Sequence, residues 1–210
     1  MQMNCTDCKA SVRFVADGSW ARTCSSCQSL VLRSGERYAV GLPRMALLPD
    51  LSPMAVGSVG SFAGAEFRIV GRMRVEGSNG YRNFWSLQGR DLPYRWLVHA
   101  YGTFALMAKW PGQFPKSEMR GIKPNRSMKL DDGLDYCAEM LDNSFRFAFE
   151  GELMEPLQLP YTIELEAGRA PNDKVIVHVM ADAGLEALVG IMVDYEELHF
   201  EHSPTWARWI

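Results

Sequence analysis

Four cysteines in two Cys-x-x-Cys pairs restrict the amino-terminal part of this chain more than any other feature. Cys5 and Cys8 form the first pair, Cys24 and Cys27 form the second, and 15 residues separate the two pairs. This spacing is typical of four-thiolate zinc sites, because each short pair can turn both of its sulfurs toward one ion. The sequence therefore predicts a zinc ribbon over residues 1–40.

The loop between the two pairs has the pattern of a β-hairpin. Val12 and Phe14 alternate with polar residues, Asp17 and Gly18 supply turn chemistry, and residues 20–23 lead back to the second pair. A module of this size buries too little apolar surface to fold alone. We therefore expect the zinc to be structural and to supply much of the folding free energy of the ribbon.

Redox chemistry is the alternative use of these cysteines. A thioredoxin-like motif has one Cys-x-x-Cys pair within a βαβ pattern, and this chain has two pairs and no such pattern. The fifth cysteine, Cys137, is expected to pack in the protein interior. The first residues contain neither a basic leader nor an apolar stretch, and no apolar run is long enough to cross a membrane, so we expect a cytoplasmic protein.

Prolines and glycines divide the ribbon from the rest of the chain. Residues 41–56 contain Pro43, Pro49 and Pro53, which predicts a linker whose apolar side chains lie along the body. The body follows over residues 57–202. An aromatic tail over residues 203–210 is expected to dock on its own domain, and docking on another protein is the alternative.

Short runs of β-branched and aromatic residues recur through the body and predict a mainly β fold, as a sheet or a barrel. Asn79-Gly80 has the pattern of a hairpin turn, and residues 134–141 fit a strand as well as a helix; we predict a strand there. In the ribbon, Leu30 and Leu32 are expected to form a third short strand after the hairpin. The strands predicted in the body include residues 67–70, 84–87, 96–100, 145–149, 161–165, 175–180 and 187–193.

Two segments of the body have similar residues at a nearly constant offset. Gly89-Arg90 and Val98-His99 align with Gly168-Arg169 and Val177-His178 at an offset of 79 residues. This register predicts an internally duplicated small β unit, with repeats over residues 60–105 and 138–185. Chance similarity is the alternative, because few identities are involved.

The charges are distributed unevenly along the chain. Residues 1–130 contain 18 basic and 8 acidic residues, a balance of +10, and residues 131–202 contain 3 and 17, a balance of −14. Two readings stay open: the basic half contacts an external polyanion, or the two halves attract each other within the chain.

Several segments of the body resemble the bacterial family called domain of unknown function 4178. They include residues 56–60, 67–72, 84–87 and 149–153, and the resemblance extends over about residues 55–200. It implies a predominantly β domain that often follows a cysteine ribbon, but it brings neither a reaction nor a catalytic residue set. Asn83 and Met154 depart from the pattern of the family, which has an acidic residue and a proline at these places.

Arginines alternate with aromatic residues between positions 67 and 96. Proteins that bind single-stranded nucleic acids place cations beside aromatic stacking surfaces in this way, although the same aromatic residues are also needed for a core. The candidate nucleic-acid face consists of Arg68, Arg72, Arg74, Arg82, Trp85, Arg90, Tyr94 and Arg95.

Histidines and paired glutamates are the candidates for catalysis or for a second metal. Glu150 and Glu152 are two residues apart, as are Glu164 and Glu166, so each pair would share one face of a strand. We expect these pairs to be solvated and the strand histidines to be structural. Those histidines are His99 and His178, and His199 and His202 form a further spaced pair.

The sequence thus predicts a zinc ribbon joined to a β body that binds or scaffolds a protein partner. Nucleic-acid binding through the arginine-aromatic face is the first alternative, and an enzyme that uses the glutamates or histidines is the second.

Overall fold

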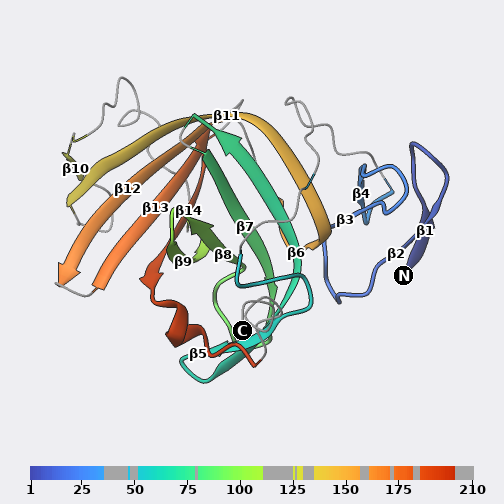
Figure 1. Cartoon of the computed structure of the whole chain (residues 1–210), viewed down its shortest axis with the longest axis horizontal. Coiled ribbons are helices and arrows are strands. Elements are labelled where there is room, and N and C mark those ends of the chain that lie inside the picture. The colour runs from blue at the N-terminus through green and yellow to red at the C-terminus, as the bar shows by residue number, and fades with distance from the viewer. Residues whose placement is uncertain are drawn as a thin grey trace, which may run out of the picture.

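The computed structural model describes residues 1–35, 47, 52–78, 80–110, 125, 127–129, 135–156, 161–170, 173–181 and 185–201. It is a mainly β protein with a small amino-terminal module beside a larger sheet (Figure 1). The module, residues 1–35, contains β1 (Gln2–Asn4), β2 (Ser11–Arg13), β3 (Ala21–Thr23) and β4 (Leu30–Leu32). Strand β1 pairs with β2, and β3 pairs with β4.

The first half of the body is a series of antiparallel hairpins. The five strands pair in chain order, from the first to the last: β5 (Val59–Phe62), β6 (Ala65–Gly77), β7 (Gly80–Gln88), β8 (Trp96–Ala100) and β9 (Thr103–Lys109). The predicted turn after β6 is confirmed, because Gly77 pairs with Gly80; Asn79 itself lies outside the described residues.

The second half contains β10 (Ser127–Lys129), β11 (Asp135–Leu153), β12 (Tyr161–Ala170), β13 (Asp173–Ala181) and β14 (Leu185–Val193), followed by the short helix η1 (Tyr195–Leu198). Strands β11 to β14 pair in order, β14 pairs with β9, and β11 pairs with β6. The pairings of β6–β9 and β11–β14 therefore close on themselves. We call these eight strands the closed sheet.

Apolar side chains cover both faces of the first hairpin series. On one face, Met73, Phe84 and Trp96 join Phe147 and further residues in the main core. On the other face, a second core forms around Ile69 and Trp85 and is covered by Met54 and by residues near η1. The register of β6 shifts between Ile69 and Gly71, and the extra residue there reverses the alternation of its side chains. Ile69, before the shift, therefore packs in the second core, and Met73, after it, packs in the main core.

The strand predictions for the body are confirmed, including the strand over residues 134–141, most of which lies in β11. Long runs of β-branched and aromatic residues suit strands that are covered on both faces. The strands that lie largely within the two proposed repeats, β6–β8 and β11–β13, pair in chain order in both, which is what a duplication predicts. The duplication itself stays a prediction.

The hairpin predicted within the ribbon is wrong. In residues 1–35, which the structure describes completely, β2 pairs with β1, and β3 pairs with β4 and with β11. The loop between β2 and β3 instead encloses a glutamate side chain from the body, described below. Most of the predicted linker and the tail after residue 201 lie outside the described residues. The only helix in the described part of the chain, η1, is far too short to span a bilayer.

Candidate metal centre

The sulfurs of Cys5, Cys8, Cys24 and Cys27 all lie within 4.8 Å of one another. The Sγ atoms of Cys5 and Cys27 are 3.6 Å apart, and so are those of Cys8 and Cys24. Sulfurs bound at about 2.3 Å to one tetrahedral ion are separated by about 3.8 Å. The predicted group of four is thus brought together at a separation that suits a metal ion, without a disulfide between any of its members.

Both pairs sit on the same kind of turn. The backbone N–H of Lys9 donates to the carbonyl of Cys5 at 3.0 Å, and that of Gln28 donates to the carbonyl of Cys24 at 2.8 Å. Lys9 and Gln28 have φ values of 64° and 62°, the left-handed conformation that closes such a turn. Two equivalent turns therefore each contribute two sulfurs to the group of four.

The two turns are also joined by side chains. Ser29, which follows the second turn, donates from Oγ to the carboxylate of Asp7 in the first turn. The Ser29 Oγ lies 3.3 Å from the sulfur of Cys27, and hydrogen bonding by the Ser29 side chain and backbone lowers the pKa of Cys27 to about 6. This serine favours the thiolate that a metal needs.

The pKa of Cys8 is shifted in the opposite direction. A backbone hydrogen bond with Ala10 lowers it, but hydrogen bonding with Cys27 and the other thiols outweighs this effect and raises the pKa of Cys8 to about 12. Neighbouring sulfurs cannot all ionise while no positive charge offsets their repulsion. Binding of a cation would therefore have to displace the proton of Cys8.

The module has little core apart from these cysteines. Cys5 and Cys24 are buried with Val12, Phe14 and Val31, whereas Cys8 is exposed and Cys27 half-buried. Four thiolates fill a tetrahedral shell, so the arrangement leaves no position for a metal-bound water. This donor set suits a structural ion.

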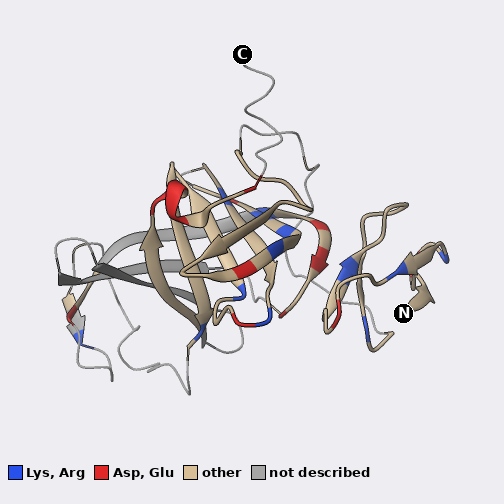
Figure 2. Cartoon of the chain, turned by 90° about the horizontal axis from the view of Figure 1, so that it is seen from below, with Lys and Arg blue, Asp and Glu red and all other residues tan. Residues whose placement is uncertain are grey.

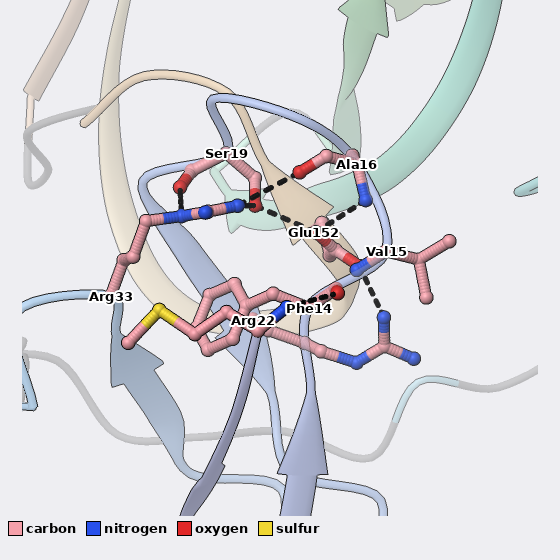
Figure 3. Close-up of polar contacts among 8 residues, drawn as sticks. Phe14, Val15, Ala16, Ser19, Arg22, Arg33 and Glu152 are labelled. Atoms are coloured by element: carbon pink, nitrogen blue, oxygen red, sulfur yellow. Dashed lines mark hydrogen bonds and ion pairs between the residues drawn. The ribbon is translucent and has the colours of Figure 1, made fainter.

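The module is attached to the closed sheet by Glu152. This residue is only 2% exposed, and its carboxylate accepts hydrogen bonds from the backbone N–H groups of Val15 and Ala16 at 2.7 and 3.0 Å. The Ser19 hydroxyl donates to it at 2.7 Å, and Arg22 forms an ion pair with it (Figure 3). The prediction that Glu152 is solvated is therefore wrong.

Glu150 and Glu152 do not form a carboxylate pair. Glu150 is bonded to Arg72 of β6 at 2.8 Å, whereas Glu152 contacts the amino-terminal module. Between them, Gly151 has a φ of +70°, which interrupts the alternation that would place both side chains on one face. The two carboxylates have separate partners and share no site.

The arginine-aromatic residues do not gather on one exposed face. Arg72, Arg74, Arg82 and Trp85 are buried, Tyr94 and Arg95 are half-buried, and only Arg68 and Arg90 are exposed. Arg72 stacks on Trp85 at 4.6 Å, and burial lowers the pKa of both Arg72 and Arg74. The buried members cannot stack on bases without a rearrangement of the sheet. Nucleic-acid binding thus stays a prediction that this placement does not favour.

Two ion pairs of the described residues agree with attraction between the basic and the acidic half of the chain. Arg22 and Arg72, from the basic half, pair with Glu152 and Glu150 of the acidic half. In Figure 2 basic and acidic segments lie interspersed over the described part of the sheet.

The remaining candidates are scattered. His99 stacks on Phe104 at 4.6 Å, and burial followed by the charge of Arg74 lowers the pKa of His99, which favours a neutral imidazole. His178, Glu164 and Glu166 lie on β13 and β12. Exposed His199 ends η1, and His202 lies outside the described residues.

Sequence reasoning missed the residues that support the cysteines. Asp7 and Ser29 lie within or directly after the cysteine pairs, and their proximity to the pairs was the available signal. Arg33, which donates to the carbonyls of Ala16 and Ser19 at 2.9 and 2.6 Å, had no such signal. Nor did Glu152, which is 125 residues from Cys27.

Comparison with known proteins finds no match at any level: neither a family model, nor a curated protein, nor a solved structure is similar to this chain.

Proposed function

We propose that Cys5, Cys8, Cys24 and Cys27 bind one structural zinc ion, and that the protein is a non-enzymatic module that binds or scaffolds a protein partner. Zinc binding is supported by the close approach of four sulfurs that lie on two equivalent turns. A tetrahedral set of thiolates favours zinc over harder cations, and iron is the main competitor. Bound zinc would fix both turns of the module and would leave no open position for substrate.

The non-enzymatic part of the proposal rests on the separation of the polar groups that chemistry would need. Glu150 is engaged with Arg72, Glu152 with the module, and the ring of His99 with Phe104. Acid–base catalysis needs such groups within reach of one substrate, and these have different partners in different parts of the fold.

Metal analysis of the full-length protein tests the zinc. We expect one zinc per chain, and we expect cobalt substitution to give the absorption of a tetrahedral four-thiolate site. Cys24→Ser should lose the metal, while Cys137→Ser, outside the group of four, should retain it. If the full-length protein binds neither zinc nor iron, the proposed metal site is wrong.

Affinity purification from the native cell tests the partner. We expect a protein that is recovered in equal amounts with and without nuclease treatment. Recovery of nucleic acid alone would favour the arginine-aromatic alternative, and its binding should then weaken steeply as salt is raised.

Two further parts of the proposal are the compartment and the family. Thiols that bind zinc persist in a reducing environment, which supports a cytoplasmic location. Membership in the domain of unknown function 4178 family stays a hypothesis, supported by the placement of its sequence motifs in β6, β7 and β11.

A further inference from the structure

Within the described part of the chain, every hydrogen bond that the Glu152 carboxylate accepts comes from the amino-terminal module. The donors belong to Val15, Ala16, Ser19 and Arg22, all within the loop that separates Cys8 from Cys24. Figure 3 shows this loop folded around the carboxylate at the end of β11. A buried charge is stable only while such donors surround it, so the loop and the carboxylate depend on each other.

Two glycines allow β11 to reach the module. Gly71 of β6 pairs with Gly151 of β11, and a Cβ on Gly71 would lie 2.0 Å from the carbonyl oxygen of Glu152. A Cβ on Gly151 would lie 2.4 Å from the carbonyl oxygen of Val70. At this close crossing β11 leaves β6, and its last residues, Glu152 and Leu153, pair with β3.

Apolar contacts accompany the polar ones. Ala21 and Leu30 of the module lie in the main core together with Phe149 and Leu153 of β11, and Trp20 packs against them. The backbone N–H of Trp20 also donates to the carbonyl of Leu153 at 2.8 Å. If the module moved away, water would reach Glu152 and these apolar side chains. The pairings that close the sheet do not involve the module, so they would persist.

The loop that holds Glu152 depends in turn on the cysteines at its two ends. The core of the module consists of five buried residues, two of which are Cys5 and Cys24. Arg33 braces the loop through Ala16 and Ser19, but Arg33 itself follows the second cysteine turn. Without an ion to join the turns, the donors to Glu152 lose the frame that positions them.

We propose that the metal keeps the module docked on the closed sheet through Glu152, and that loss of the metal releases the module and uncovers the end of β11. This inference rests on the proposed zinc site and adds its regulation. Glu152 is a positioning residue, because it acts on the metal only through the loop. Linkage is reciprocal: if metal binding favours docking, docking favours metal binding by the same factor, so a change that undocks the module lowers the metal affinity by up to that factor.

Hydrogen exchange and zinc competition on the full-length protein test the proposal. When a chelator removes zinc, we expect faster exchange in residues 11–33 and also at Glu152 and Leu153, while β7 and β8 stay protected. Glu152→Gln should weaken zinc binding about 5- to 150-fold, the usual range of coupling between sites. Glu150→Gln is the matched control, because Glu150 contacts Arg72 of the sheet and not the module; it should bind zinc like the unaltered protein.

Ser19→Ala removes a single donor from the module side and should produce a smaller shift in the same direction, which keeps the test open if Glu152→Gln fails to fold. Full zinc binding with unchanged exchange at Glu152 and Leu153 after chelation would overturn the coupling alone. Unaltered zinc affinity in both variants would do the same. Absence of zinc from every protein, including the unaltered chain, would overturn the zinc proposal and the coupling together.

Discussion

Among the described residues, the core of the amino-terminal module contains five buried side chains, whereas the two cores of the closed sheet contain thirteen and ten. Two of the five are cysteines, and two residues of the module, Ala21 and Leu30, are buried in the main core. Apolar burial scales with the size of a folding unit, and a unit of about 35 residues is too small to depend on it. We therefore expect the module to depend on an ion and on its neighbour, and the sheet to depend on neither.

The two regions are therefore expected to be stabilised in different ways. In the sheet, each strand of the closed ring has a paired neighbour on both sides. In the module, we expect most of the order to depend on two points, the four sulfurs and the Glu152 carboxylate. A substitution at either point is therefore expected to destabilise the whole module and to leave the sheet folded.

The largest effect should follow the loss of the metal. Removal of zinc, or Cys24→Ser, should abolish exchange protection over residues 1–35, since metal binding contributes about 10–16 kcal/mol in comparable zinc peptides. Circular dichroism should show that most strand signal persists. Collapse of the whole sheet on chelation would contradict the separation of the two regions.

The converse change is a large-to-small substitution in the main core. Trp96 is fully buried, so Trp96→Ala should lower the free energy of unfolding by about 3–5 kcal/mol. Urea denaturation measures this change, and Arg90→Ala, at an exposed position, is the control. Below the new midpoint the variant should still bind one zinc per chain; loss of zinc from the folded variant would indicate that the metal site depends on the sheet as a whole.

The sequence predicted the sheet and the sulfurs because both depend on local patterns. Runs such as residues 96–100 have strand propensity wherever they lie, and each Cys-x-x-Cys pair forms its own turn. The predicted hairpin of residues 12–23 failed for the opposite reason. Its loop was free to pair locally, but it encloses Glu152, a residue more than 120 positions away.

Register and crossing points are a further limit of sequence reasoning. The paired glutamates were expected on one face from the period of a strand, and Gly151 breaks this period. A glycine within a strand signals a bulge or a close approach, but the partner, Gly71, is identified only when β6 and β11 pair. The buried arginines were misjudged similarly, because their burial depends on which face of the sheet is covered.

Within the module, the residues around the sulfurs should have smaller effects than the sulfurs themselves. Ser29→Ala removes the hydrogen bond that the hydroxyl donates to Asp7 and the contact of its oxygen with the sulfur of Cys27, and such outer residues usually change metal affinity about 10- to 100-fold. Competition with a chromophoric chelator measures this change. Ser26→Ala, at an exposed position of the same turn, should have no effect.

The pH dependence sharpens this prediction. Ser29 keeps the pKa of Cys27 at about 6, below that of an ordinary thiol, so Cys27 is mainly a thiolate at pH 7. Zinc competes with protons, so its affinity should fall with decreasing pH because Cys8 must lose its proton, and the fall should become steeper below about pH 6, where Cys27 is also protonated. Without the Ser29 hydroxyl the pKa of Cys27 rises, so zinc release should begin at a higher pH than in the unaltered protein. If zinc release follows the same pH dependence in Ser29→Ala and in the unaltered protein, Ser29 does not influence the metal centre.

The smallest effect is expected on the outer surface of the sheet, where Tyr81 is 51% exposed and its ring lies 5.5 Å from the guanidinium of Arg74. Tyr81→Leu keeps an apolar side chain but removes the cation–π contact, which contributes about 0.5–1 kcal/mol at exposed positions. Tyr101→Leu is the matched comparison, because its contact with Arg82 is longer, at 6.0 Å, and should contribute less. Urea denaturation resolves both changes, and neither should alter zinc affinity, since both tyrosines belong to the sheet. A change in zinc affinity caused by either tyrosine would show that the coupling between the sheet and the module extends beyond the contacts made by Glu152, β3 and the main core.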